Sequence, residues 1–579
     1  MRAKSITATP SQIMVDQLAA SGIKHLFYNS GSREALFFDA LQMHPDIHGV
    51  LSLHEGSVAS MAGGYAQTNL DPAVMVVHLG AGLAQCLGQF INIWHGSLPV
   101  VVMTFAGDTG SFADRINLDI SHSFGPTALA APLTKATWTV IEPEGLPQAI
   151  HRAIQVAKTP PVGPVHLAIY DRMLGHEQTT TKIINDPMTE LRAGYPADSD
   201  VEALAQAIHE AERPILYVGD GVWKSRAEAE VTALAERFGL PVVTGWGELR
   251  SVARKHPLHC GYLQRGAAQM NPDLILCIGV RHDGAGKLRD LEALDRAEKV
   301  IAIGSDVANL KSLGGLDLAI LADEKRTVQR LLDWLDDASQ RTDVYSERIA
   351  WAEGQAAKLR NRLVTSAQAV PQQADSIRPW VLADHLDNSL ENAGGGIVTI
   401  EQYALPMDCA GAVSKDSRNL YLQAPGASEG WGIGAAIGAK LAAPSQTVVG
   451  LVGDGSFCYA DSGIWTTAHH NIPLLYVIPN NGAYGIVANS FQRAEGNMAR
   501  TGEYAGVTLS NIDPVKVAEG FGLEAMHVQE EAKLEAAFAH GLKVVNEEQR
   551  PFLLNVQLPL GLPAGGSTAQ EYDFRELSD

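Results

Sequence analysis

The sequence predicts an α/β protein made of three consecutive parallel-sheet domains. Short apolar runs, typical of buried strands, alternate along the chain with longer stretches of helical periodicity. Polar, turn-forming stretches divide this alternation into three blocks, each with several strand and helix units. The length of 579 residues agrees with this division, because one domain per ~150 residues gives three or four domains.

Two regions without strand patterns separate the blocks. Residues 178–181 and 185–200 lack periodicity and contain turn formers, so they predict a linker. Residues 336–377 are charged and rich in Gln and Ala, and they predict a connecting helix followed by a second linker. The division that follows is a first domain at 1–185, a central domain at 200–340, a third domain at 370–560 and a C-terminal tail at 561–579.

Each block supplies the strands of its own sheet. The runs are almost continuously apolar, which is typical of strands buried on both faces of a parallel sheet. The predicted strands are 25–28, 50–53, 73–77, 99–104 and 165–169 in the first block, 214–219, 241–244, 274–279 and 299–304 in the second, and 396–400, 447–452, 473–478 and 552–556 in the third.

The composition argues against several classes of function. Lys and Arg total 44 against 65 Asp and Glu, and the resulting net charge of −21 opposes binding to nucleic acid or anionic lipid. No apolar stretch approaches the ~20 residues that span a bilayer, and the start lacks the apolar core of a secretory signal, so we expect a cytoplasmic protein. The five cysteines have no CxxC or CxH spacing, which argues against a zinc site or a disulfide framework.

Two polar turns follow consecutive predicted strands in the third block. Residues 453–456 read GDGS, and residues 480–484 read NNGAY after one helix and one further strand. The carboxyl ends of adjacent parallel strands joined by a right-handed crossover lie side by side, so Asp454 and Asn481 can converge. Either turn alone is also an ordinary way to end a strand, but the two together in one βαβ unit are specific.

The chemistry of these turns suits a divalent cation and a diphosphate. The Asp454 carboxylate, the Asn481 amide oxygen and the Ala483 carbonyl could hold Mg²⁺, which prefers oxygen ligands. Gly453 and Gly455 let the backbone approach phosphate groups, and the N-terminus of the following helix would add a favourable dipole.

These residues resemble the cofactor motif of thiamine-diphosphate enzymes, which opens with GDG and closes with NN. The resemblance to the decarboxylase/acetolactate synthase superfamily extends over nearly the whole chain, with a pyrimidine-binding block first and a diphosphate-binding block last. It implies thiamine diphosphate and Mg²⁺ as cofactors, with Ser456 and Tyr484 among the residues that bind them. It also implies a homodimer or homotetramer, because family members place the cofactor between the first block of one chain and the third block of its partner.

A glutamate in the first block matches the family's proton-relay residue. Glu55 ends a predicted strand and opens a small-residue helix in a segment that resembles the family's HE…GYA pattern. In the family this carboxylate hydrogen-bonds the aminopyrimidine ring of the cofactor. An exposed glutamate stabilised by the helix dipole is the alternative, and Asp454 and Asn481 make the relay role the better interpretation.

Within the superfamily the chain is most similar to the benzoylformate decarboxylases. The turn around Ser32 resembles their NPGS segment, and His78 resembles their strand-end histidine. The resemblance implies that Ser32 holds the substrate carboxylate and that His78 transfers protons, which suits a group that titrates near neutrality. A turn serine and a strand-end structural histidine are the alternatives.

Three further residues are candidates because they depart from the family pattern or only partly match it. Glu429 stands where relatives carry a large hydrophobic residue that supports the cofactor, so either a one-residue shift hides that residue or a carboxylate lies beside the cofactor. His122 falls about where acetolactate synthases carry glutamine, and it is equally well an inert loop residue. His282 follows a strand of the central block near where benzoylformate decarboxylases contribute a second histidine, but the spacing differs.

The resemblance implies a thiamine-diphosphate-dependent carbon–carbon lyase. The first hypothesis is non-oxidative decarboxylation of a benzoylformate-like 2-oxo acid to an aldehyde, with carboligation to 2-hydroxy ketones at the same site. The second is an acetolactate-synthase-like carboligase or a 2-hydroxyacyl-CoA lyase, for which FAD or ADP in the central domain would be the distinguishing feature. A catalytically silent cofactor-binding protein is the third, and intact Glu55, Asp454 and Asn481 argue against it.

Overall fold

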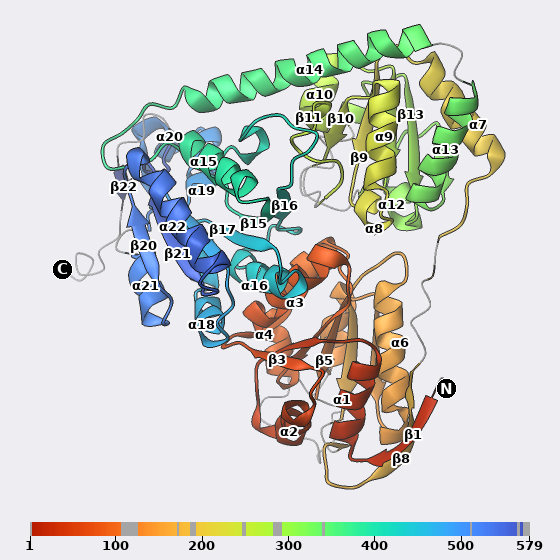
Figure 1. Cartoon of the computed structure of the whole chain (residues 1–579), viewed down its shortest axis with the longest axis vertical. Helices are drawn as coiled ribbons and strands as arrows, with labels where there is room; N and C mark the ends of the chain where they lie inside the picture. The colour runs from red at the N-terminus through yellow and green to blue at the C-terminus, as the bar shows by residue number, and fades with distance from the viewer. Residues whose placement is uncertain are drawn as a thin grey trace.

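The structure is a computed structural model, and it has three α/β domains, as the sequence predicts (Figure 1). Each domain contains a six-stranded sheet in which all neighbouring strands are parallel. No helix in the described part of the chain is both long and apolar enough to cross a membrane. The structure describes residues 3–105, 125–170, 173–185, 191, 193–245, 250–281, 292–338, 342–509, 512–563 and 568–570.

The N-terminal domain carries its helices on both faces of the sheet. Its helices are α1 (Pro10–Ala20), α2 (Ala35–Met43), α3 (Glu55–Asn69), α4 (Leu79–His95), α5 (Pro126–Ala130) and α6 (Leu146–Lys158). Its strands are β2 (His25–Tyr28), β3 (His48–Leu51), β4 (Ala73–Val77), β5 (Val100–Thr104), β6 (Ala136–Val140) and β7 (Val165–Ile169). The sheet order is β3-β2-β4-β5-β7-β6.

The central domain has the same general architecture. Its strands are β9 (Pro214–Val218), β10 (Val242–Thr244), β11 (His259–Tyr262), β12 (Leu274–Ile278), β13 (Lys299–Gly304) and β14 (Leu318–Leu321), in the order β11-β10-β9-β12-β13-β14. Its described helices are α7 (Asp198–Glu210), α8 (Gly221–Lys224), α9 (Glu228–Phe238), α10 (Leu263–Met270), α12 (Val307–Ser312) and α13 (Glu324–Ala338). The long helix α14 (Thr342–Gln368) then runs from this domain to the C-terminal one, as Figure 1 shows.

The C-terminal domain carries the GDGS and NNGAY turns. Its strands are β15 (Gly396–Glu401), β16 (Leu420–Gln423), β17 (Thr447–Val452), β18 (Leu475–Asn480), β20 (Ala525–Val528) and β21 (Phe552–Gln557), in the order β16-β15-β17-β18-β21-β20. Its helices are α15 (Pro379–Asn392), α16 (Gly432–Ala442), α17 (Asp454–Tyr459), α18 (Ser462–His469), α19 (Gly485–Arg493), α20 (Asn497–Thr501), α21 (Pro514–Gly520) and α22 (Leu534–Asn546). A two-stranded sheet of β19 (Glu503–Ala505) and β22 (Thr568–Gln570) lies beside it.

The structure corrects two details of the predicted strands. The prediction of a linker at 178–181 is wrong, because β8 (Thr179–Ile184) pairs antiparallel with β1 (Ala3–Ala8). This small sheet is half exposed and polar, so it lacks the apolar run that marks a buried strand. The strand predicted at 50–53 lies at 48–51, where it pairs with β2.

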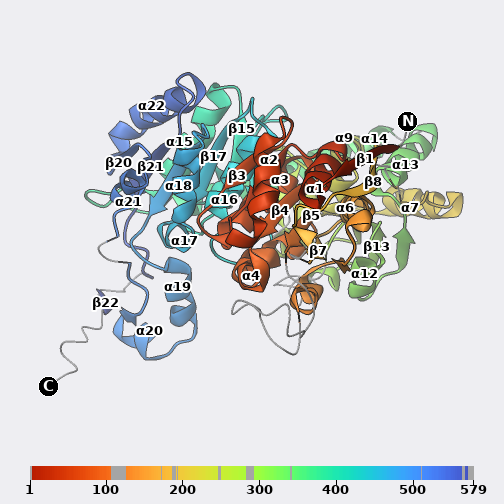
Figure 2. The ribbon, with the colours of Figure 1, turned by 90° about the horizontal axis from the view of Figure 1, so that it is seen from below.

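Helices α3 and α16 join the N-terminal domain to the C-terminal domain. They lie side by side in both views, and small residues line the contact (Figures 1 and 2). A Cβ atom on Gly64 would lie 2.4 Å from the Ala435 backbone, and one on Gly438 would lie 2.0 Å from the Met61 carbonyl oxygen. The backbones can therefore approach this closely only because these positions lack side chains.

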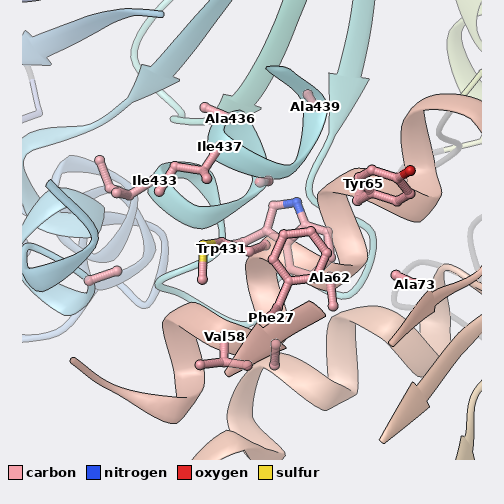
Figure 3. Packing of buried hydrophobic residues seen from close by; sticks show 14 of the residues in the cluster. Phe27, Val58, Ala62, Tyr65, Ala73, Trp431, Ile433, Ala436, Ile437 and Ala439 are labelled. Atoms are coloured by element: carbon pink, nitrogen blue, oxygen red, sulfur yellow. The ribbon is translucent and has the colours of Figure 1, made fainter. Parts of the chain in front are cut away.

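A shared hydrophobic cluster surrounds this contact. Trp431, just before α16, is fully buried, and its ring lies against Gly63 of α3. Figure 3 shows Trp431 between Ala62 of α3 and Ile433 and Ile437 of α16. The two domains therefore share one core at this interface, and their relative position is fixed by tight packing.

We expect Gly438→Val to destabilise the chain. The added side chain would collide with the Met61 and Tyr65 backbones, which lie 2.0 and 2.5 Å from the position of its Cβ. Overpacking of this kind costs about 1–3 kcal/mol or more, so the urea midpoint of unfolding should fall clearly. Gly354→Ala is the matched control, because nothing lies within 4 Å of its Cβ position. A Gly438→Val protein with the wild-type midpoint would contradict this view of the interface.

Candidate active site

Polar residues at the carboxyl ends of β17 and β18 meet in a cavity of about 1650 Å³. The cavity lies between the C-terminal domain and a loop and helix of the central domain, which contribute Arg254, Tyr262 and Arg265. The structure brings all the candidate cofactor residues of the third block to this one cavity. They are Glu429, Gly453, Asp454, Gly455, Ser456, Asn481, Ala483 and Tyr484.

The Asn481 amide meets two oxygen atoms at one point of the cavity wall. One terminal atom of the amide lies 3.1 Å from Asp454 Oδ1 and 2.8 Å from the Ala483 carbonyl oxygen. With nitrogen at this position, the NH₂ group donates to both oxygens and satisfies them. With oxygen at this position, three acceptors face one another, and a cation between them would satisfy all three. The same three residues can therefore hold a hard cation once the amide oxygen is turned toward it.

The Asp454 carboxyl is buried, and its surroundings disfavour its charged form. Burial raises its pKa to about 6, although N–H groups of the turn, Gly482 among them at 2.9 Å, partly offset this. In the described part of the chain no cluster of three or more His, Cys, Asp or Glu side chains has metal-binding geometry. A cation here would use one carboxylate together with amide and carbonyl oxygens, as Mg²⁺ often does when phosphates complete its shell.

The two glycines of the GDGS turn have different roles. A Cβ on Gly453 would meet nothing closer than 3.8 Å, so this backbone is open to the cavity. A Cβ on Gly455 would lie 2.6 Å from the Tyr484 ring, so this glycine makes room for the tyrosine. The helix expected to supply a dipole, α17, has only six residues, and its contribution is correspondingly small.

Glu429 also faces the cavity, beside the GDGS turn. Its Oε2 accepts a 2.7 Å hydrogen bond from the Ser456 hydroxyl, and its charge contributes to the raised pKa of the nearby Tyr403 phenol. Neighbouring Glu401, at the end of β15, accepts N–H groups of Gly430 at 2.7 Å and Gly432 at 2.5 Å. Burial raises the pKa of Glu401 well above its usual value, and the Glu429 charge raises it further.

The N-terminal domain presents a second set of candidates at its own carboxyl edge. Ser32, Glu55 and His78 follow β2, β3 and β4, which are neighbours in the sheet. Glu55 is the first residue of α3 and is 8% exposed. Its Oε1 lies 3.0 Å from the position of a Cβ on Gly82, so this glycine of α4 leaves room for the carboxylate.

A buried carboxylate orients His78. Both oxygens of Glu34 lie within hydrogen-bond distance of His78 Nδ1, at 2.9 and 2.8 Å, and the Glu34 side chain is almost fully buried. This contact fixes the ring and leaves its Nε2 for other partners. A Cβ on Gly31 would lie 1.9 Å from His78 Nδ1, so the turn that carries Ser32 packs directly against the imidazole.

The two edges do not meet within one chain. None of the described residues lining the 1650 Å³ cavity belongs to the N-terminal domain. The nearest link is helix α4, which starts beside Glu55 and donates from Gln89 to the Glu429 backbone carbonyl. Each chain therefore carries two separate sets of candidate residues, which we name after the parts of thiamine diphosphate that the resemblance assigns to them. The ring-side set is Ser32, Glu34, Glu55 and His78, and the diphosphate-side set surrounds Asp454.

Comparison with known proteins decides the family. Three models of the thiamine pyrophosphate enzymes match consecutive parts of the chain, the N-terminal TPP binding domain at 8–122, the central domain at 201–331 and the C-terminal TPP binding domain at 409–556. The chain belongs to the thiamine pyrophosphate enzymes. The C-terminal match contains both the GDGS and the NNGAY turn, and the N-terminal match contains Glu55 and His78.

Relatives of this thiamine pyrophosphate enzyme include decarboxylases and carboligases. The chain is 25% identical to benzoylformate decarboxylase of Pseudomonas aeruginosa, over 93% of this chain and 97% of that protein. It is 26% identical to the acetolactate synthase isozyme 1 large subunit of Escherichia coli, over 95% and 94% of the two chains. The fold matches a thiamine diphosphate-dependent 4-hydroxybenzoylformate decarboxylase of Rhodococcus jostii with a TM-score of 0.78, at 24% identity and over 96% and 99% of the two chains.

Sequence reasoning missed several polar residues of this enzyme, and two candidates cannot be placed. His122 and His282 lie outside the described residues. Glu34, Glu401 and Tyr403 were not singled out. The sequence pattern could have identified Glu401, because this residue ends a buried strand next to the strand that precedes the GDG turn. It could also have identified Glu34, because this residue follows Ser32 in the same strand-end turn.

The central domain has a smaller cavity of about 410 Å³ at the carboxyl ends of β9, β12 and β13. Arg281 Nε lies 2.8 Å from Asp220 Oδ2 there, and Gly221 lies against Gly279 so closely that a Cβ on either would collide with the other. Glu324, 2% exposed, accepts the Ser305 N–H at 2.9 Å and its hydroxyl at 3.0 Å.

We expect Glu324 to make the stability of this domain depend on pH. Burial raises its pKa from 4.5 to about 7, so between these values the folded chain binds a proton that the unfolded chain does not. Stability should therefore fall as pH rises through this window, by roughly 3 kcal/mol in total. Glu324→Gln should remove this fall, with a higher Tm than wild type at pH 8 and the same Tm at pH 5. Parallel pH profiles for the two proteins would refute this expectation.

Proposed function

We propose that this enzyme catalyses the thiamine-diphosphate- and Mg²⁺-dependent decarboxylation of a benzoylformate-like 2-oxo acid to an aldehyde. The observation that carries the proposal is the meeting of the Asp454 carboxylate, the Asn481 amide and the Ala483 carbonyl in a cavity large enough for cofactor and substrate. The relatives named as benzoylformate and 4-hydroxybenzoylformate decarboxylases support the substrate class. Carboligation to 2-hydroxy ketones would be a second outcome at the same site.

The diphosphate-side residues would hold the cofactor through Mg²⁺. With the Asn481 amide oxygen turned toward the ion, the separations of 2.8 and 3.1 Å between that atom and the Ala483 and Asp454 oxygens fit one ion. Adjacent ligands of an octahedral Mg²⁺ with bonds of 2.0–2.1 Å are about 2.9 Å apart. The open backbone at Gly453 and the Ser456 hydroxyl would contact the phosphates, and Tyr484 would line the same wall.

The ring-side residues would supply binding and proton transfer. When bound, thiamine diphosphate supplies the carbon nucleophile and accepts the electron pair released with carbon dioxide. Glu55, buried at the start of α3, would hold a proton at the cofactor ring. His78, oriented by Glu34, would give and take protons at the substrate oxygen or carbon, and the exposed Ser32 would bind the substrate carboxylate.

We propose that the working unit is at least a homodimer. The ring-side set and the diphosphate-side set are separate within one chain, which supports this arrangement. In a dimer, Glu55 of one subunit could face Asp454 of another. Residues Tyr459, Ile486 and Leu560 at the cavity are 59%, 49% and 49% exposed, which is more apolar exposure than an isolated site would favour. A second subunit would cover them.

An acetolactate-synthase-like carboligase or a 2-hydroxyacyl-CoA lyase is the second candidate. The relatives named as acetolactate synthases support it, and so does a central-domain cavity whose mouth carries Lys224, Arg226, Lys325 and Arg326. Its volume of about 410 Å³ favours a small anionic group over a whole dinucleotide. Flavin in the purified protein would be detected by its absorbance at about 450 nm.

The proposed function is tested by a product screen. The protein with thiamine diphosphate and Mg²⁺ is given benzoylformate, 4-hydroxybenzoylformate, pyruvate and 2-oxobutanoate, and carbon dioxide, aldehyde and hydroxy ketone are measured. Aldehyde from the aromatic acids is the expected result. Hydroxy ketone as the main product from pyruvate would favour the second candidate. Absence of all three products would move the assignment toward lyase chemistry.

We expect Glu55→Gln to abolish turnover but not cofactor binding. Glutamine keeps the size of the side chain and cannot hold the proton, so turnover should fall by roughly 10²- to 10⁴-fold. Calorimetric titration should give a thiamine diphosphate affinity within a few-fold of wild type, because Glu55 is not part of the diphosphate-side set. A variant with full turnover would reverse the assignment of Glu55.

We expect Glu34→Gln to lower kcat by at least about tenfold with little change in KM. The amide cannot accept from His78 Nδ1 with both of its terminal atoms, as the carboxylate does at 2.9 and 2.8 Å, so the ring loses its fixed orientation. Glu142→Gln is the matched control, since Glu142 is an exposed acid of the same domain. Equal kcat values for the two variants would argue that Glu34 is only structural.

A further inference from the structure

We propose that Glu429 sets the affinity of the enzyme for its cofactor, because its carboxylate competes with the diphosphate for the Ser456 hydroxyl. This inference rests on the proposed role of Ser456 at the diphosphate. It concerns binding rather than turnover, so the product screen and the experiment below can fail independently.

The competition follows from the hydrogen-bonding capacity of serine. The Ser456 hydroxyl has one proton, and it donates that proton to Glu429 Oε2 over 2.7 Å. A phosphate oxygen that accepts from the same hydroxyl has to take the proton from Glu429. Both acceptors are charged, so the new hydrogen bond can replace the old one in strength, but the half-buried Glu429 carboxylate is left without its donor, and this loss is the cost of the exchange.

The position of Glu429 is fixed from both sides, so the carboxylate cannot simply move away with its loop. On one side, Gln89 of α4 donates to the Glu429 backbone carbonyl, and Asn92 Nδ2 donates to the Ser428 carbonyl at 2.8 Å. On the other side, Glu401 accepts the Gly430 N–H at 2.7 Å. Only rotation of the side chain is left to release Ser456.

Ser456 is the one side chain that donates a hydrogen bond to the Glu429 carboxylate among the described residues, and no ion pair with Glu429 is found there. The nearby Tyr403 phenol supplies no positive charge: burial raises the pKa of Tyr403, and the charges of Glu429 and Glu401 raise it further. The negative charge of Glu429 remains uncompensated near the place where a diphosphate would bind.

The charge of Asp454 acts in the same direction. Asp454 and Glu429 both line the cavity, and a cation held by Asp454 would compensate only Asp454. Of the cations lining the cavity, Arg254 is paired with Asp408 at 2.8 Å, and Arg265 and Arg493 are exposed at its mouth. A diphosphate would therefore meet like charge from Glu429 in a partly buried site, where screening is weak.

The experiment measures cofactor affinity by isothermal calorimetry on protein stripped of cofactor and supplied with Mg²⁺. The ligands are thiamine diphosphate and thiamine, which share the rings and differ in the diphosphate. The variants are Glu429→Gln, Ser456→Ala and the double variant. Glu547→Gln, which removes one exposed negative charge far from the cavity, is the matched control. Thermal unfolding without ligand reports whether each variant is folded.

We expect Glu429→Gln to bind thiamine diphosphate at least about tenfold more tightly than wild type, with thiamine affinity unchanged. The control should match wild type. Because the effect runs through the hydroxyl, the gain should be much smaller when Ser456 is alanine. These three results together would support the competition.

Two results would overturn the proposal. If Glu429→Gln binds thiamine diphosphate with wild-type or lower affinity while remaining folded, the carboxylate does not compete with the diphosphate. If thiamine gains as much affinity as thiamine diphosphate, Glu429 acts on the rings and not on the phosphates. If Glu429→Gln is unstable, Glu429→Ala is measured in its place against the same two ligands.

Discussion

The close packing of α3 on α16 is the constraint on which the rest of the arrangement depends. Because Gly64 and Gly438 lack side chains, the backbones of α3 and α16 can lie in contact. This contact fixes the N-terminal domain on the C-terminal domain. Helix α4 packs on α3 and extends this fixed arrangement to the loop that carries Glu429. As a result, no ring-side residue lines the diphosphate-side cavity of the same chain, and this separation supports the proposed second subunit.

Electrostatics at the diphosphate side follow from the parallel sheet itself. Neighbouring strands β15, β17 and β18 end at the same edge, and they bring Glu401, Asp454 and Asn481 together. Burial raises the pKa values of Glu401 and Asp454, so the carboxylates are costly there without a cation. A metal ion at Asp454 would lower that cost, whereas a diphosphate would add negative charge and, under our proposal, would have to displace Glu429 from Ser456.

The sequence was most informative where a strand is buried on both faces. The central strands, such as β4, β5, β12 and β17, are continuous apolar runs and were predicted. Within the three six-stranded sheets, the strands that were not predicted, β6, β11, β14, β16 and β20, are all at the edge of a sheet. An edge strand is covered on fewer sides, so it can contain polar residues, and its pattern then resembles that of a loop.

The same physical reason separates the site residues that could be predicted from those that could not. Asp454, Asn481, Glu55 and His78 follow strands whose apolar pattern is clear, so the strand-end rule points to them. Glu34 and Tyr403 act through contacts made by turns, and turn geometry is not encoded in a periodic pattern. Glu429 is intermediate, because the sequence marks it as unusual while only its contact with Ser456 indicates what it does. The departure of Glu429 from the family pattern thus identifies a residue whose role needs explaining. Its hydrogen bond with Ser456 is the contact from which we infer that role.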